Sequence, residues 1–367
     1  MSDIQTQVQQ RIDQLVESGT ERGVQVAVLR HGELLVDAVA GIADPATGRA
    51  VTPETVFYNF SIGKAATSTV VHVLVERGTF AYDTPVAELW PEFAAHGKEN
   101  VTVRQVLTHS AGVPGLPLDT TAEDICDWDR ICAKVADAEL WWEPGTAVGY
   151  HAYTFGYILG EVVRRATGKP ISQVLRDEVT GPLGVADELY FGMPTSQHGR
   201  LARLEDQAGA ADMMAGMPED LPMLKAGPLS LFPTAELGNR TDILAADIPA
   251  GGKTSARAMA RMYAALLGDI PGVALIPPER LREVTAPAAS GVDQVFGNES
   301  SWGLGYALGL PGAEEATRSA FSMGGAGGSY AYGDTGIAFA MTKNRLTMDF
   351  SAATDLIRVV NEGLEKG

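Results

Sequence analysis

The sequence predicts an α+β protein in which the two ends of the chain build one α/β lobe and the middle forms an inserted, mainly helical lobe. Two observations predict this division: strand-like runs gather near both ends, and helical spacing dominates between them. We expect residues 1–60 and 250–367 to form the α/β lobe and residues 61–249 to form the helical lobe with long covering loops, with the functional site between the lobes. A chain of 367 residues with 45% hydrophobic content is long enough for two lobes.

Near the N-terminus, the spacing of apolar residues predicts a helix followed by a hairpin. The helix, at 4–18, carries apolar side chains at helical intervals, namely Ile4, Val8, Ile12, Leu15 and Val16. Two β-rich runs follow at 24–29 and 34–40, and the dipeptide His31-Gly32 between them indicates a β-hairpin. Helical spacing returns at 61–77, where Gly78 suits a C-terminal cap.

The middle of the chain reads as helices and loops, and the C-terminal part returns to strands. Helical stretches are expected at 102–108, 121–138, 154–167, 171–178 and 255–267. Residues 205–250 are rich in Met, Pro and Gly with weak periodicity, which is typical of a functional or covering loop. Strands separated by glycine-rich turns are expected at 302–308, 320–323, 328–332 and 336–342, and a last amphipathic helix at 351–364.

Composition excludes several kinds of partner. The formal net charge of −18 gives a surface that repels nucleic acid and anionic membranes, so neither is expected to bind. The N-terminus lacks a signal pattern and no apolar run is long enough to cross a bilayer, which predicts a cytoplasmic protein. Cys126 and Cys132 are expected to be free thiols, and their spacing suits no metal, so no metal and no other cofactor is expected. The oligomeric state is not readable.

The tetrapeptide Ser61-Ile62-Gly63-Lys64 is the first segment that could carry chemistry. A spacing of three on a helix places the serine and the lysine on one face. A lysine in the first helical turn opposes the helix dipole, and that field together with burial should lower its pKa. A neutral lysine can then act as a base toward the hydroxyl. The alternative is a serine cap beside a solvated lysine, and the local sequence does not separate the two.

Two further segments could complete such a site. Tyr150 lies between a turn at 143–146 and a helix that starts at residue 153, where its hydroxyl could face a cleft. The alternative is a tyrosine packed at an interface with a wet hydroxyl. The glycine-rich run at 321–329 could let a strand edge donate a backbone N–H to an oxyanion, or it could be a plain hairpin turn.

Other nucleophilic and phosphate-binding motifs fit poorly. The segment around Ser61 lacks the first glycine of a Gly-x-Ser-x-Gly elbow, and the six histidines show no local signature of a Ser-His-Asp triad. Gly252-Lys253-Thr254 resembles half of a phosphate loop or a Lys-Thr-Gly strand, but it lacks the third glycine and opens a helix, so we interpret it as unrelated.

Together, these segments resemble the serine β-lactamase and penicillin-binding superfamily, and within it the family VIII carboxylesterases, which share the class C β-lactamase fold. The resemblance covers nearly the whole chain and includes the stretch 103–112. It implies a β-lactamase/D,D-peptidase-like fold with an antiparallel sheet flanked by the terminal helices. It also implies that Ser61 is the acylated nucleophile, Lys64 its base partner and Tyr150 a proton shuttle, with the backbone N–H groups of Ser61 and Ala326 as the oxyanion hole.

Two departures from the superfamily pattern bear on the substrate. Where β-lactamases carry Tyr-x-Asn this chain has Tyr150-His151-Ala152, and where they carry Lys-Thr-Gly, or many esterases His-x-Gly, it has Met323-Gly324-Gly325. Both changes remove groups that would bind an amide or a carboxylate, so a small neutral carboxylic ester is the expected substrate. Substrate contacts are expected from His151, Met323, Gly324, Gly325 and Trp142.

Two alternatives to a carboxylesterase remain open at this point. The same residues could serve a β-lactamase, an amide or peptide hydrolase, or an acyltransferase. The fold could also carry a non-catalytic binding protein, although binding alone has no chemical need for a serine, a lysine and a tyrosine together. Trp141 and the methionines between 213 and 223 could line a pocket or simply pack beneath a long loop.

Overall fold

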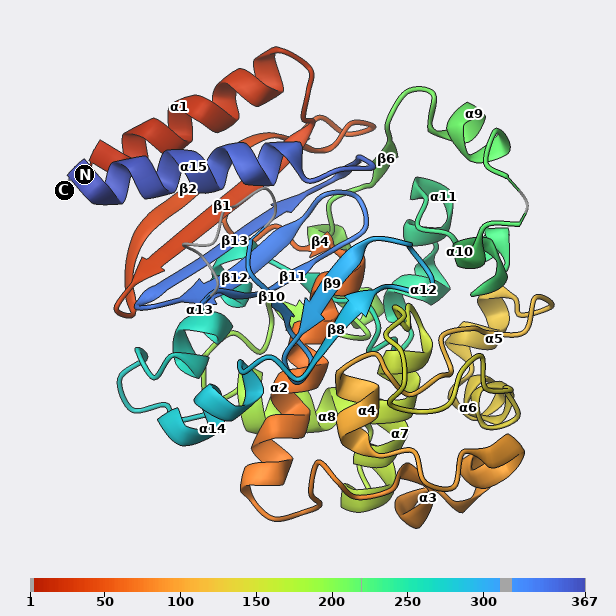
Figure 1. The fold of residues 1–367 in the computed structure, drawn as a ribbon. Coiled ribbons are helices and arrows are strands. Elements are labelled where there is room, and N and C mark those ends of the chain that lie inside the picture. The colour runs from red at the N-terminus through yellow and green to blue at the C-terminus, as the bar shows by residue number, and fades with distance from the viewer. Residues whose placement is uncertain (1–2, 219, 311–318, 367) are drawn as a thin grey trace.

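A nine-stranded antiparallel sheet organises the fold (Figure 1). The computed structural model describes residues 3–218, 220–310 and 319–366. The strand order is β3-β2-β1-β13-β12-β11-β10-β9-β8. The strands are β1 (Gly23–Arg30), β2 (Glu33–Asp44), β3 (Arg49–Ala50), β8 (Ala289–Val292), β9 (Glu299–Trp302), β10 (Ala307–Leu308), β11 (Phe321–Gly324), β12 (Tyr330–Asp334) and β13 (Ile337–Lys343). The register from Val24 opposite Lys343 to Arg30 opposite Ile337 joins the two ends of the chain.

The terminal helices cover one face of this sheet. Helices α1 (Asp3–Glu17) and α15 (Ser351–Lys366) lie together across it and bury an apolar cluster that includes Val8, Ile12 and Leu356. Helix α13 (Ala256–Leu266) packs on β1, β12 and β13 from the opposite side. The predicted α+β class, with an antiparallel sheet flanked by terminal helices, is therefore confirmed.

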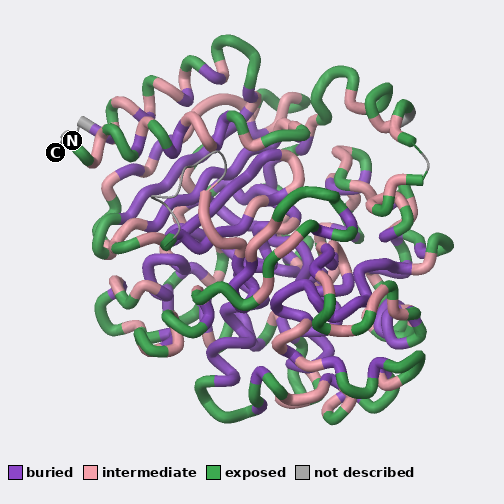
Figure 2. The backbone as a smooth tube through the Cα atoms, viewed as in Figure 1, coloured by how far each residue is buried: buried purple, intermediate pink, exposed green. Residues whose placement is uncertain are grey.

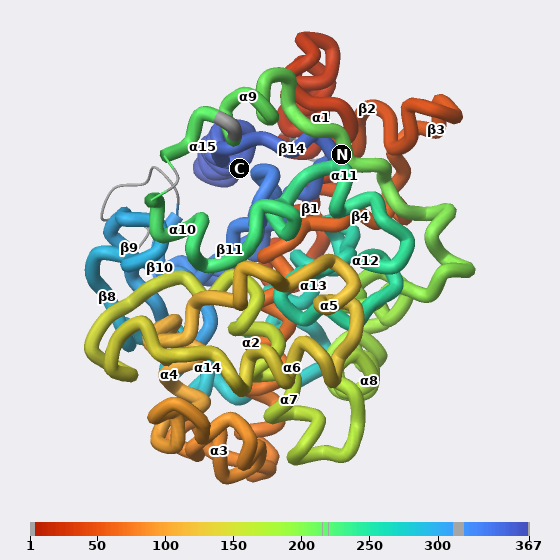
Figure 3. The backbone as a smooth tube through the Cα atoms, turned by 90° about the vertical axis from the view of Figure 1, so that its right-hand side faces the viewer, coloured from red at the N-terminus to blue at the C-terminus, as the bar shows by residue number. Residues whose placement is uncertain are grey.

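The remaining helices lie beside and below the sheet. They are α2 (Gly63–Glu76), α3 (Val86–Leu89), α4 (Val103–Leu107), α5 (Ala122–Cys126), α6 (Trp128–Ala136), α7 (Thr154–Thr167), α8 (Ile171–Leu175), α9 (Ala210–Ala215), α10 (Pro222–Lys225), α11 (Ala235–Gly238), α12 (Thr241–Ala245) and α14 (Pro278–Val284). Figure 3 shows α1 and α15 at one end of the molecule and α3, α6 and α7 toward the other. Every residue of α2 from Gly63 to Val75 is buried, and Figure 2 shows that buried backbone runs from the sheet into this centre.

Several expected elements differ in their bounds. The helix expected at 121–138 is two helices, because Asp127 ends α5 and caps α6 with its carboxylate. The strand expected at 302–308 is not continuous, because it contains only the last residue of β9 and, after a break, the whole of β10. Gly252-Lys253-Thr254 does not open a helix. Lys253 and Thr254 form β7, the central strand of a small sheet with β4 (Phe57–Tyr58) and β5 (Leu189–Tyr190), and Ser255 caps α13.

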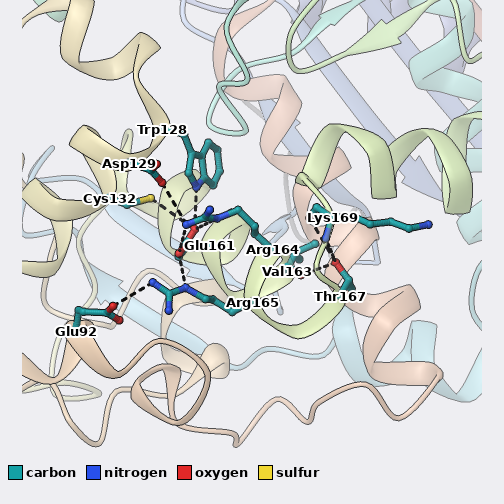
Figure 4. Close-up of polar contacts among 10 residues, drawn as sticks. All are labelled: Glu92, Trp128, Asp129, Cys132, Glu161, Val163, Arg164, Arg165, Thr167 and Lys169. Atoms are coloured by element: carbon teal, nitrogen blue, oxygen red, sulfur yellow. Dashed lines mark hydrogen bonds and ion pairs between the residues drawn. The ribbon is translucent and has the colours of Figure 1, made fainter.

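A buried carboxylate links α6 to α7 (Figure 4). Glu161 on α7 accepts hydrogen bonds from Trp128 at 2.8 Å, from Arg164 at 2.6 and 2.8 Å, and from Arg165 at 2.7 Å. Burial alone would raise the pKa of Glu161, but these three donors outweigh burial and lower it. Arg165 also pairs with Glu92, so the cluster joins three segments of the helical region.

The strands β6 (Glu205–Asp206) and β14 (Arg345–Leu346) pair in parallel and anchor the start of the irregular stretch after residue 205 to the C-terminal part of the chain. Within residues 3–218, 220–310 and 319–366, no helix combines the length and the apolarity needed to cross a membrane.

Candidate active site

Ser61 lies at the entrance to α2, in a tight turn that is held under backbone strain. The preceding residue, Phe60, has φ of +46°, a left-handed conformation that a bulky side chain rarely adopts. Phe60 packs against Tyr58 with ring centroids 4.4 Å apart, and its carbonyl accepts from the N–H of Gly252 at 2.9 Å. The surrounding packing therefore fixes a strained turn that presents Ser61, which is half-buried.

Lys64 lies one turn further along and points back at the serine. Its Nζ donates to Ser61 Oγ at 3.0 Å and to the carbonyl oxygen of Ala250 at 3.1 Å. The side chain is fully buried, and burial lowers its pKa from the ordinary 10.5 to about 7. At neutral pH this amine is therefore available in its neutral form, which can accept a proton from the hydroxyl. The solvated alternative for Lys64 is wrong.

A backbone segment that the sequence analysis did not assign to the site holds this lysine in place. Residues 249–252 run against the first turns of α2, where Thr67 Oγ1 donates to the carbonyl oxygen of Pro249 at 2.6 Å. A methyl group at Gly63 would come within 2.2 Å of the Gly252 nitrogen, so only glycine allows the two backbones to approach this closely. The signal in the sequence was the Gly251-Gly252 pair, two residues after a proline.

Tyr150 approaches the same serine from the loop before α7. Ser61 is close enough to the Tyr150 hydroxyl to lower its pKa as a hydrogen-bonding neighbour, and Lys64 Nζ lies 4.9 Å from the centroid of the Tyr150 ring. Burial raises the pKa of Tyr150 well above its usual range, although the hydrogen bond with Ser61 acts in the opposite direction. The phenol therefore stays protonated at neutral pH, which suits a group that donates a proton or passes one on.

The glycine-rich turn after β11 packs directly against the backbone that precedes Ser61. A methyl group at Gly325 would come within 2.1 Å of the Asn59 carbonyl oxygen. Ser329 Oγ donates to Asn59 Oδ1 at 2.8 Å, and the Asn59 amide donates to the carbonyl oxygens of Phe57 and Thr254. Among the described residues, the N–H of Ala326 has no acceptor. The glycine turn therefore lies beside the backbone of Ser61, and the oxyanion-binding role of the Ala326 N–H stays a prediction.

The predicted substrate contacts are placed less clearly. Both ring nitrogens of His151 are engaged inside the protein, because Nε2 accepts from Val113 N–H at 3.0 Å and Nδ1 donates to the Gly149 carbonyl at 2.6 Å. Met323 is 1% exposed and belongs to the main core, so its side chain packs within the protein. Substrate contact through either side chain has no support in these positions and stays a prediction.

Gly324 and Trp142, which were also predicted to contact substrate, likewise face protein groups, as Gly325 does at Asn59. Gly324 packs against Phe350, whose ring would lie 2.6 Å from an added methyl group. Trp142 lies across Gly149 and meets the ring of His151 edge-on, with centroids 5.9 Å apart. Its buried indole N–H has no partner among the residues that the structure describes. Trp142 thus backs the loop that carries Tyr150.

Three aromatic or imidazole rings that the sequence analysis did not assign to the site surround Tyr150. The ring of His109 lies 4.7 Å from it, Phe296 lies 5.5 Å away and Trp302 lies 6.0 Å away, all measured between centroids. Phe296 is half exposed, so the apolar wall around Tyr150 continues to the surface. In the described part of the chain, no group of three or more His, Cys, Asp or Glu is arranged to hold a metal ion.

Comparison with known proteins is consistent with this arrangement. The family described as Beta-lactamase matches residues 8–362. The chain belongs to the Beta-lactamase family. Esterase/beta-lactamase LipL of Mycobacterium tuberculosis is 34% identical over 344 residues, which cover 88% of this chain and 77% of LipL. Penicillin-binding protein 4 of Amycolatopsis lactamdurans is 30% identical over 378 residues, covering 95% and 87% of the two chains.

Solved structures give the same family and fold. A crystal structure of a family VIII carboxylesterase superimposes with a TM-score of 0.88 at 31% identity, covering 99% of this chain and 98% of the other. The resemblance to the β-lactamase and penicillin-binding superfamily is thereby confirmed, and the chain is a serine hydrolase. The non-catalytic alternative is not retained.

Proposed function

We propose that this member of the Beta-lactamase family is a carboxylesterase that hydrolyses small neutral esters through an acyl-enzyme on Ser61. The observation that carries the proposal is the buried Lys64 amine, which lies 3.0 Å from Ser61 Oγ with a pKa of about 7. A base with that pKa is half neutral at physiological pH, where an ordinary lysine is almost entirely charged.

The reaction begins with proton transfer from Ser61 to neutral Lys64. Ser61 Oγ attacks the ester carbonyl, and the oxyanion that forms accepts from the backbone N–H groups of Ser61 and Ala326. As the tetrahedral intermediate collapses, the carbon–oxygen bond to the leaving group breaks and Tyr150 gives its proton to the departing alkoxide. The proton held by Lys64 then restores Tyr150, because both groups contact Ser61.

Deacylation repeats these steps with water in place of the alcohol. Water loses a proton to the Lys64 and Tyr150 pair as it attacks the acyl carbonyl, and the proton returns to Ser61 Oγ when the acid leaves. Because the two groups share one proton, the apparent pKa values of the reaction belong to the pair. In this scheme Lys64 is the first base, since burial keeps Tyr150 protonated near neutrality.

An ester is favoured over a lactam by the residues that replace polar groups of the superfamily. Ala152 offers no amide to a lactam side chain, and Met323 carries no charge for a substrate carboxylate. Relatives named as an esterase and as a family VIII carboxylesterase support the same choice. One relative is named both esterase and β-lactamase, which makes lactam hydrolysis the second candidate.

The test is turnover of p-nitrophenyl acetate and butyrate beside nitrocefin, with wild type and Ser61→Ala. We expect the wild type to hydrolyse the esters at a higher kcat/KM than nitrocefin, and Ser61→Ala to be inactive on both. Nitrocefin turnover that exceeds ester turnover would promote the lactam hypothesis. No ester turnover by wild type, or equal turnover by Ser61→Ala, would contradict the proposal.

A further inference from the structure

His109 contacts Tyr150 and both of its chain neighbours. The N–H of Gly149 donates to the His109 carbonyl oxygen at 3.0 Å, and the N–H of His151 donates to His109 Nδ1, also at 3.0 Å. The imidazole ring itself lies 4.7 Å from the Tyr150 ring, tilted by 33°. One residue therefore fixes the backbone on both sides of Tyr150 and one face of its ring.

The imidazole is itself held rigidly. Phe155 stacks on it with centroids 4.9 Å apart, and Trp302 meets it edge-on at 4.3 Å. The side chain is fully buried, so the ring has no room to turn away from Tyr150. A rigid support of this kind transmits its own position to the residue that it contacts.

The protonation state of His109 follows from its contacts. Because Nδ1 accepts a backbone N–H, the proton of the neutral ring is on Nε2. Burial lowers the pKa of His109 well below its usual value, and the neighbouring His151 and Lys64 act in the same direction. Because the His109 ring is neutral, no second buried cation lies beside Lys64. A charged His109 would disfavour the protonated form of Lys64 that the reaction needs after proton transfer.

His109 keeps this place despite two unfavourable features. Its φ is +56°, which is uncommon for a residue other than glycine. Its Nε2 is buried with no hydrogen-bond partner among the residues that the structure describes. A strained backbone and an unpaired buried donor each destabilise the folded protein. Such features are typically retained where the geometry of the position serves another purpose.

We propose that His109 is a positioning residue that holds the Tyr150 hydroxyl against Ser61, through its Nδ1 and carbonyl contacts to the flanking backbone and through its ring. The inference rests on the proposed function, in which Tyr150 carries a proton to the leaving group. Histidine suits the position because it combines a flat ring with a hydrogen-bond acceptor. Asparagine offers an acceptor without the ring, and phenylalanine offers the ring without an acceptor.

The test is a double-mutant cycle that joins His109→Asn and His109→Phe to Tyr150→Phe, measured on p-nitrophenyl butyrate. Misplacement of a catalytic group by about 1 Å reduces rates by roughly 100-fold, so we expect each His109 variant to lower kcat by about 30- to 100-fold while KM changes less than about threefold. In the Tyr150→Phe background the same changes should lower kcat by less than about threefold, because the group being positioned is already gone.

Two controls separate positioning from a general loss of structure. His72→Asn also removes a buried histidine, whose ring bonds to Tyr82 and to the Leu304 carbonyl and makes no contact with Tyr150. We expect it to lower the melting temperature without the kcat coupling to Tyr150. Where turnover of a double variant is too slow to follow, the rate at which a fluorophosphonate labels Ser61 completes the cycle.

Wild-type protein gives a test that does not depend on the folding of any variant. In ¹⁵N-histidine spectra, His109 is expected as the Nε2–H tautomer with an unprotonated Nδ1. An Nδ1–H tautomer would overturn the inference. So would wild-type kcat in both His109 variants while Tyr150→Phe is impaired, a result that leaves the proposed function standing. Absence of ester turnover by the wild type would overturn the proposed function and this inference together.

Discussion

The low pKa of Lys64 sets the pH dependence that the site should show. At pH 7 a lysine with the ordinary pKa of 10.5 is neutral in about one molecule in 3,000, whereas a pKa of about 7 makes about half of the molecules neutral. Burial thus raises the population of the base by roughly 1,500-fold, which corresponds to about 4–5 kcal/mol. This gain in the population of neutral Lys64 is lost at a pH well below its pKa, where the amine is protonated in every molecule.

The direction of the pH dependence of kcat/KM follows from the protonation state of Lys64 that acts as the base. Neutral Lys64 is the base, so kcat/KM should rise about tenfold per pH unit below the pKa and level off above it, with a midpoint near 7. Lys64→Arg should lower kcat/KM by at least about 1,000-fold across the range, because a guanidinium stays charged. The assay is p-nitrophenyl butyrate hydrolysis from pH 5 to 9, corrected for spontaneous hydrolysis.

A second buried lysine, Lys253, provides a matched control for Lys64. Lys253 is fully buried as well, burial lowers its pKa to about 7, and its Nζ donates to the Phe191 carbonyl rather than to Ser61. Lys253→Met should therefore keep the midpoint near 7. A midpoint that moves in Lys253→Met, or near wild-type activity in Lys64→Arg, would refute the reasoning.

Three substitutions test the supports of the site and of the fold. Gly325→Ala places a methyl group 2.1 Å from the Asn59 carbonyl oxygen and should lower kcat by about 100-fold with little change in KM, so unchanged kcat would contradict the close approach. Asn59→Ala removes three hydrogen bonds and should lower the free energy of unfolding by about 3 kcal/mol in urea titrations. Glu161→Gln should lower it by about 3 kcal/mol at pH 7 and by less at a pH below the lowered pKa of Glu161, because the contribution of the carboxylate is fully present above its unfolded pKa and is lost as the pH falls through its folded pKa. Equal destabilisation of Glu161→Gln at both pH values would exclude the ionic contribution.

The parts of the fold and site that could be predicted are those with a local pattern. The β-rich runs of β1 and β13 predicted strands at these positions, and the helical spacing of α1 and α15 predicted the two terminal helices. Ser61 and Lys64 could be proposed because a spacing of three places them on one helical face. The break at Asp127 was missed because apolar spacing continues across it from α5 to α6.

The supports of the site could not be predicted, because they depend on contacts between distant segments. The Ala250 carbonyl meets Lys64 across 186 residues of sequence, and a backbone acceptor leaves no side-chain pattern. His109 contacts the backbone of His151, 42 residues away, through a ring whose tautomer only the folded protein determines. His151 was expected to contact substrate, but its ring nitrogens are both used within the protein.

Mass spectrometry of the acyl-enzyme tests the central claim most directly. Wild type mixed with p-nitrophenyl butyrate and quenched in acid should gain the mass of one butyryl group, which peptide mapping should place on Ser61, and Tyr150→Phe should accumulate more of it where deacylation slows. Absence of an adduct in both proteins during ester turnover, or an adduct on another residue that persists in Ser61→Ala, would contradict the account.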